Sequence, residues 1–225
     1  FQAIAPASDE SFTVSNNVAN SLAHMVATVT VPEDNSLQKD ILMANADKVT
    51  EKSNSRKVQL NFKHVLSQVR FSVKTASKQV SGEIEDIALC NIKKIGTVGF
   101  QGEDAGTSAA DWAVTLASKE PANLTEKTTY SIGMVGDGTF GDSEYTVAQD
   151  MTAADGSLLM LPQTTVKWAT ADGPGNAVTI AEADAAFNTY IKISCKIKNG
   201  NTYLLGSNDS FGDVYIPFKA EWTMG

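Results

Sequence analysis

The sequence has few of the residues on which catalysis and metal binding usually depend. Its two histidines are His24 and His64, and its two cysteines are Cys90 and Cys195. Two cysteines make no disulfide framework, and no Cys-x-x-Cys pair indicates zinc or redox chemistry. Both cysteines lie in apolar runs, so we expect them to be buried as small hydrophobic side chains, with a disulfide between them as the lesser alternative.

Long apolar runs and an excess of basic charge are also absent. No stretch approaches the roughly 18 apolar residues of a membrane-spanning helix. Phe1 to Pro6 reads as part of a strand and not as a signal peptide, which indicates a processed or trimmed form of a longer protein. The formal net charge of −8 disfavours binding to nucleic acid or to anionic lipid.

The dominant hydrophobic period is two residues, the period of a β-strand with one buried face. Val58, Leu60 and Phe62 alternate with polar residues. The alternation resumes over Val69–Val73 with the opposite parity, so we predict a β-bulge or bend at 65–68. The same alternation predicts strands over Trp112–Leu116, Tyr130–Met134, Val166–Trp168, Ile191–Ile197 and Val214–Trp222.

Other segments complete an all-β pattern. Ile87–Ile92 and Leu158–Leu161 are apolar at most positions and are expected to be buried on both faces. Pro217 lacks an N–H, which predicts an edge position for its strand. Short strands separated by Gly, Asn and Asp turns, such as Gly136-Asp137-Gly138, indicate a sandwich or a barrel. Only Leu37–Asn45 and the Ala-rich Glu182–Tyr190 suggest short helical turns.

A polar stretch at 48–56 predicts a domain boundary. Residues 1–50 would then be the end portion of an N-terminal β-sandwich domain, and 51–225 a C-terminal β-sandwich domain. The first part is too short to be stable alone, so we expect it to pack on the second domain or on residues outside this chain.

No histidine has the surroundings of a catalytic or metal-binding residue. His64 continues the inward parity of Val58, Leu60 and Phe62, and no second histidine or acidic residue lies at ligand spacing. A structural histidine that binds nearby backbone at a strand bend is therefore the preferred interpretation. No nucleophile elbow, phosphate loop or dinucleotide fingerprint is present.

Carboxylates are common but scattered. Asp137, Asp142 and Glu144 lie in a Gly-rich loop that could bind calcium, yet they lack the alternation and the terminal Glu of an EF-hand. A solvated hairpin tip is the preferred interpretation. A glycosidase pair far apart in the chain stays open, although nothing indicates one. We expect no catalytic residue, no metal ligand and no cofactor.

The tryptophans Trp112, Trp168 and Trp222 each lie in an alternating strand. A sugar-binding module would expose such aromatic rings as platforms. The strand parity instead predicts that the three rings point inward, into the core.

Several short motifs resemble those of the fimbrillins, pilus proteins of Bacteroides-type bacteria. Phe62, His64, Leu66 and Val69 fit the family's Phe-x-His-x-Leu-x-x-Val segment. The other matching segments, in chain order, are Phe1–Pro6, Asp40–Ala44, Leu161–Gln163 and Ile216–Phe218 followed by Glu221–Gly225. The family pattern has further strands before the first segment and a Tyr-rich strand after the last.

The resemblance implies two transthyretin-like β-sandwich domains of Greek-key type, the first only partly covered. It also implies a non-enzymatic subunit that is exported as a lipoprotein, trimmed, and assembled into a surface fimbria by strand exchange with other pilus subunits. Host or bacterial surface ligands would be further partners. The alternative is a surface adhesin or carbohydrate-binding protein at a pilus tip.

Overall fold

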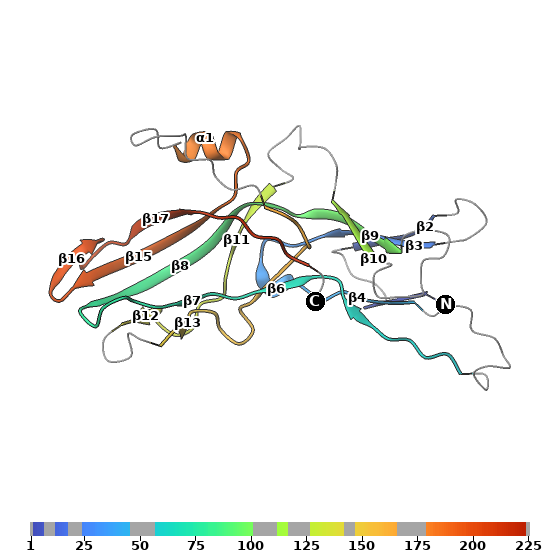
Figure 1. Cartoon of the computed structure of the whole chain (residues 1–225), viewed down its shortest axis with the longest axis horizontal. Coiled ribbons are helices and arrows are strands. Elements are labelled where there is room, and N and C mark those ends of the chain that lie inside the picture. The colour runs from blue at the N-terminus through green and yellow to red at the C-terminus, as the bar shows by residue number, and fades with distance from the viewer. Residues whose placement is uncertain are drawn as a thin grey trace.

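The computed structural model describes residues 2–6, 12–17, 24–45, 57–100, 112–116, 127–141, 147–165 and 179–223. In these ranges the chain is almost entirely antiparallel β-structure, which confirms the predicted all-β class. Figure 1 shows an elongated molecule, with the β15–β16 hairpin at one end of the long axis and β2 and β3 toward the other. The one described α-helix, α1 (Ile180–Ala185), is short, and no helix in the described part is long and apolar enough to cross a membrane.

The strands form one large sheet and several smaller ones. In chain order they are β1 (Gln2–Ala5), β2 (Phe12–Asn17), β3 (His24–Thr30), β4 (Leu42–Asn45), β5 (Lys63–His64), β6 (Ser67–Val69), β7 (Ser72–Val73), β8 (Val80–Lys93), β9 (Ile95–Phe100), β10 (Trp112–Leu116), β11 (Lys127–Ser131), β12 (Thr139–Phe140), β13 (Gln149–Asp150), β14 (Leu158–Met160), β15 (Tyr190–Asn199), β16 (Thr202–Leu205) and β17 (Gly212–Pro217).

The long strands β8 and β15 form the centre of a six-stranded sheet. β11 and β12 pair with the outer edge of β8, and β17 and β16 pair with the outer edge of β15. Separate sheets follow the orders β10-β9-β3-β2 and β1-β4-β5, and two short pairs join β6 to β14 and β7 to β13. The division at residue 50 stays a prediction. Across it, β3 pairs with β9 and β4 pairs with β5.

The main core lies against the inner face of the six-stranded sheet. Ile191 and Ile193 of β15 stand opposite Leu89 and Ile87 of β8, and all four side chains pack in this core. Tyr130 of β11 is fully buried there. Opposite residues of an antiparallel pair share one face of the sheet. The alternation at 191–197 is therefore inward-facing, as predicted.

The outer face of the same sheet is covered locally by α1. Ala88, Cys90 and Tyr190 form a small second cluster with Ala183 of the helix. Residues 87–92 are thus buried on both faces of the sheet, which confirms that prediction. A capping box starts the helix: Thr179 accepts a hydrogen bond from the Glu182 backbone N–H, and the Glu182 carboxylate accepts one from the Thr179 backbone N–H.

Two expectations for local structure are wrong. Residues 42–45 form strand β4, and helical structure near them is limited to the 3₁₀ turn η1 (Asn35–Leu37). Residues 57–62 form no strand, and Val58 and Phe62 are 37% and 45% exposed. An alternating segment becomes a strand only where another strand pairs with it, and the described residues supply none at 57–62.

Other expectations are confirmed. The strand structure is interrupted between β5 and β6, where Val65 and Leu66 are both buried, so the predicted bend exists. Pro217 ends β17, which pairs only with β15 in the described part of the chain. After Pro217 the chain continues to Glu221, which forms an isolated antiparallel β-bridge with Thr164. The predicted strand at 166–168 lies outside the described residues.

Candidate functional site

The histidines do not assemble a catalytic constellation in the described structure. His64 is exposed, and its Nδ1 contacts the Oδ2 of Asp40. The expected inward direction of His64 is therefore wrong, and its partner is a carboxylate on the segment before β4 instead of the backbone. His24 lies in β3, and its side chain is outside the described set. Within that set, no three His, Cys, Asp or Glu side chains gather as a metal site would require.

Of the three carboxylates in the candidate calcium loop, the structure describes only Asp137. Its carboxylate accepts hydrogen bonds from the Thr139 hydroxyl at 2.9 Å and the Thr139 backbone N–H at 3.2 Å. These two bonds hold the pKa of Asp137 below its usual value. The carboxylate thus closes its own turn. Asp142 and Glu144 lie outside the described residues.

The aromatic and sulfur residues are structural where they are described. Trp222 packs partly buried against the main core, which confirms its predicted inward direction. Its ring centre lies 6.0 Å from that of Phe218. The ring of Trp112 and all of Trp168 lie outside the described set. Both cysteines are free and buried, Cys195 in the main core and Cys90 under α1, and burial raises the pKa of each thiol.

A polar cluster fixes α1 to the sheet. Asp184 accepts hydrogen bonds from the Asn91 side-chain amide and from the Tyr190 hydroxyl, each at 2.9 Å. The Asn91 amide also donates to the Asn188 carbonyl, and Asn91 has a positive φ of 61°. These three hydrogen bonds join the end of α1 and the turn after it to β8 and β15.

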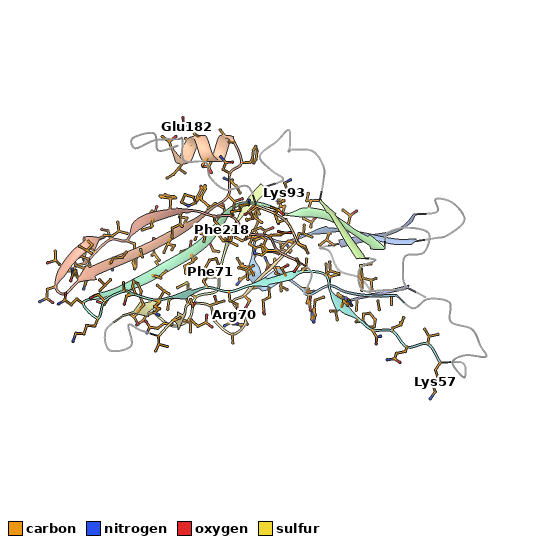
Figure 2. The ribbon with its side chains drawn as sticks, in the orientation of Figure 1. Lys57, Arg70, Phe71, Lys93, Glu182 and Phe218 are labelled. Carbon is orange, nitrogen blue, oxygen red and sulfur yellow. The ribbon has the colours of Figure 1, made fainter. Side chains whose placement is uncertain are left out.

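Arg70 binds the segment from the end of β13 to the start of β14, on the opposite side of the core. Its guanidinium donates to the Asp150 carboxylate at 2.7 Å, to the Thr152 carbonyl at 3.0 Å and to the Ser157 hydroxyl at 3.2 Å. Figure 2 shows Arg70 beside β7, with Phe71 next to it. The Arg70 bond, followed by that from the Thr152 backbone N–H, lowers the pKa of Asp150. Neither this ion pair nor the Asp184 cluster was predicted, because the partners lie about 80 and 93 residues apart.

Replacing Arg70 by methionine should remove a contribution to the free energy of unfolding, and the size of this contribution should depend on pH. The folded-state pKa of Asp150 lies below its unfolded value. The stabilisation is therefore fully present above that unfolded value, about 3.9 for Asp, and is lost as the pH falls through the folded pKa. The difference in urea midpoint between wild type and variant should be largest near neutral pH and should shrink below about pH 4. In an Asp150→Asn background the difference should not change with pH; a change there would contradict the pairing.

A surface pocket of about 230 Å³ lies on the outer face of the sheet, between β12, β8, β15 and β16. Its two lysines are engaged within the chain. The Lys196 ammonium lies 3.7 Å from the Glu83 carboxylate, and the Lys198 ammonium lies 4.5 Å from the centre of the Tyr203 ring. The pocket therefore presents an aromatic and polar surface in which the two ammonium groups contact a carboxylate and an aromatic ring of the same chain.

The edge formed by β17 and β16 carries apolar side chains that are not fully covered. Ile216 stands opposite Ile191, so its side chain is on the inner face, yet it is 41% exposed. Val214, opposite Ile193, is also only partly buried. Leu204 of β16 is 62% exposed. In a closed sandwich, inner-face positions such as those of Ile216 and Val214 lie under the second layer, so this edge is the feature best suited to bind another chain.

Comparisons with known proteins give a family match and a similar fold. A family model described as fimbrillin-like matches residues 7–208. The fold is similar to the crystal structure of a fimbrial protein from Bacteroides vulgatus ATCC 8482, with a TM-score of 0.54 over 98% of this chain and 67% of that chain. At 15% identity this likeness concerns the fold alone. No curated protein matches the chain.

Proposed function

The chain belongs to the fimbrillin-like family, and we propose that it is a structural subunit of a cell-surface fimbria whose subunits join by exchange of β-strands. The observation that carries the proposal is the open edge of the six-stranded sheet. There, β17 has one strand partner among the described residues, and Ile216 on its inner face is 41% exposed. An edge of this kind accepts an extended strand from another molecule.

The energetics of strand exchange favour a durable joint. An added strand forms backbone hydrogen bonds along the edge and inserts alternate side chains into the sandwich. Each fully buried apolar side chain contributes about 1.5–3 kcal/mol, so four or five contribute on the order of 10 kcal/mol before ordering costs. Those costs reduce the net affinity, but the dissociation rate can still be slow.

The proposal also covers the chemistry, export and location of the protein. The protein would be non-enzymatic, exported as a lipoprotein, trimmed, and held at the outer surface among other pilus subunits. Residues 1–50 and 51–225 would belong to successive sandwich domains of the transthyretin-like type. The two free, buried cysteines fit a fold whose stability comes from its core and not from cross-links.

Filaments sheared from native cells test the proposal. Mass spectrometry of the purified filaments should identify this chain as a stoichiometric component. A deletion strain should yield filaments without it, or none. If intact filaments from the wild type contain only traces of the chain, the proposed function is wrong.

A further inference from the structure

The surface pocket between β12, β8, β15 and β16 lies on a part of the outer sheet face that α1 does not reach. The helix packs over Ala88, Cys90 and Tyr190. The pocket lies further along the same strands, at 81–83 of β8 and 196–198 of β15. This part of the sheet is next to the β15–β16 hairpin, which forms one end of the long axis (Figure 1).

The strand register places the pocket side chains in two rows across the outer face. One row consists of Thr139, Glu83 and Lys196, and the other of Ser81, Lys198 and Tyr203. Each row crosses three strands, and the rows are two residues apart along β8 and β15. Strand spacing and rise then give a patch of roughly 7 Å by 10 Å. The volume of about 230 Å³ is below the range of pockets for drug-sized ligands, so one sugar ring or a ligand of similar size fits.

The two lysines of the pocket differ in how their charge is neutralised. The Lys196 side chain is 15% exposed, and its ammonium lies 3.7 Å from the Glu83 carboxylate. Lys198 has uncharged neighbours across the sheet, Ser81 on β8 and Tyr203 on β16. Among the described residues no carboxylate forms an ion pair with Lys198, and its ammonium lies 4.5 Å from the centre of the Tyr203 ring. The pocket therefore offers one positive charge that a ligand can neutralise.

The wall of the pocket is held in place before any ligand binds. Asn208, in the loop after β16, contacts both sides of it. Its side-chain oxygen accepts a hydrogen bond from the Tyr203 hydroxyl at 2.8 Å, and its carbonyl accepts one from the Lys196 ammonium at 3.1 Å. A ligand that enters such a pocket loses little affinity to the ordering of side chains.

We propose that this pocket binds a single acidic sugar residue. The sugar carboxylate pairs with the Lys198 ammonium through charge-assisted hydrogen bonds. The hydroxyls of Ser81 and Thr139 can donate to or accept from sugar hydroxyls, and the Glu83 carboxylate accepts from them. The Tyr203 ring supplies an apolar contact for the C–H groups of the sugar ring.

Charge distinguishes this ligand from other anions. Glu83 lines the pocket together with the lysines, and its carboxylate repels a compact dianion such as phosphate. A sugar with one carboxylate places its charge at Lys198 and its hydroxyls at Glu83, so each group of the pocket has a suitable partner. The formal net charge of −8 also disfavours a polyanion, whose further charges would meet the acidic surface.

Titration of the purified protein with two matched sugars tests the proposal. Methyl glucuronide has the carboxylate, and methyl glucoside has the same ring without it. We expect the glucuronide to bind about tenfold more tightly or better, as for a hydrogen bond to a charged group, and its affinity to fall as salt is added. Calorimetry measures both affinities. The methyl glycoside of N-acetylneuraminic acid, in a third titration, distinguishes a sialic acid from a uronic acid as the preferred acidic sugar.

Three variants assign the binding to this pocket. Lys198→Gln should remove the preference for the glucuronide. Lys192→Gln is the matched control, because Lys192 lies on the same face of β15, outside the pocket, and pairs with Asp213 at 3.2 Å. It should keep the preference. Glu83→Gln should tighten glucuronide binding severalfold, since it removes a like charge, whereas a merely structural role for Glu83 predicts weaker binding.

Four outcomes would overturn the proposal. Equal affinity for the two sugars, or no binding of either, would exclude an acidic-sugar site. Equal losses in the Lys198 and Lys192 variants would place the binding elsewhere. Competition by inorganic phosphate at equal concentration would leave a general anion site, and equally tight binding of triglycine would leave a carboxylate site without sugar recognition. None of these measurements requires filaments, so their failure leaves the fimbrial proposal unchanged.

Discussion

Replacing Leu89 by alanine should lower the free energy of unfolding by about 2–5 kcal/mol. Leu89 is fully buried near the middle of the sheet, where β8 places it opposite Tyr130 of β11 and Ile191 of β15. Strands on both sides hold the backbone in place, so the site cannot collapse around the smaller side chain. The cavity then adds to the lost transfer energy. Urea denaturation monitored by tryptophan fluorescence measures the change.

Leu204→Ala provides the matched control for this prediction. It removes the same atoms from a side chain that is 62% exposed at the edge strand β16. We expect a change within about 0.5 kcal/mol, as is usual for surface positions. Equal losses in the two variants would mean that Leu89 is not at the centre of the core, and the arrangement of the six-stranded sheet would be wrong.

The second large effect is expected for Gly138→Ala in the turn before β12. Gly138 has a φ of +68°, and an added Cβ would lie 2.0 Å from the Ile84 carbonyl oxygen. The Ile84 backbone N–H also donates to the Gly138 carbonyl at 3.0 Å, so the two segments cannot separate without breaking this bond. The positive φ costs about 1–3 kcal/mol, and the overpacking adds about 1–3 kcal/mol.

Gly136→Ala separates these two contributions. Gly136 lies in the same turn with a φ of +54°, but no atom lies within 4 Å of a Cβ added there. Its alanine variant should carry the conformational cost alone and should therefore unfold at a higher urea concentration than Gly138→Ala. The same midpoint for both variants would contradict the close approach of the turn to β8.

Local parity explains what could be predicted from the sequence. Along β15, Ile191, Ile193 and Cys195 face the core because they are spaced two residues apart, the period of a strand. Pairing of β15 on both edges holds it in this extended form. Parity also predicted the bend at 65–68, since a shift by one residue moves every side chain to the other face.

The same reasoning fails where the partner of a residue is distant. Asp40 meets His64 across 24 residues, and Arg70 meets Asp150 across 80. No local sequence pattern identifies these pairs, because each pair depends on the order of the strands in the fold. The strand predicted at Val58–Phe62 failed for a related reason. Its alternation indicates a face that must be covered, but not whether the covering strand belongs to the same chain.

Gln163 shows how a family motif can have a physical role that its sequence does not reveal. Its side-chain amide donates to the Lys93 carbonyl at 3.1 Å, and its side-chain oxygen accepts from the Lys93 backbone N–H at 3.2 Å. Its own carbonyl accepts a hydrogen bond from the Trp222 backbone at 2.9 Å. The motif Leu161–Gln163 thus joins the end of β8 to the C-terminal segment, while the resemblance alone indicated only the family.

Immunogold electron microscopy of native cells, with an antibody to this chain and a deletion strain as control, tests the central claim that the protein is a fimbrial subunit. The account predicts gold particles strung along filaments, absent from the deletion strain. Label confined to filament ends would favour a tip adhesin and would contradict a role as a repeated subunit of the filament. Label on the cell surface of a strain that shows no filaments would contradict the fimbrial role itself.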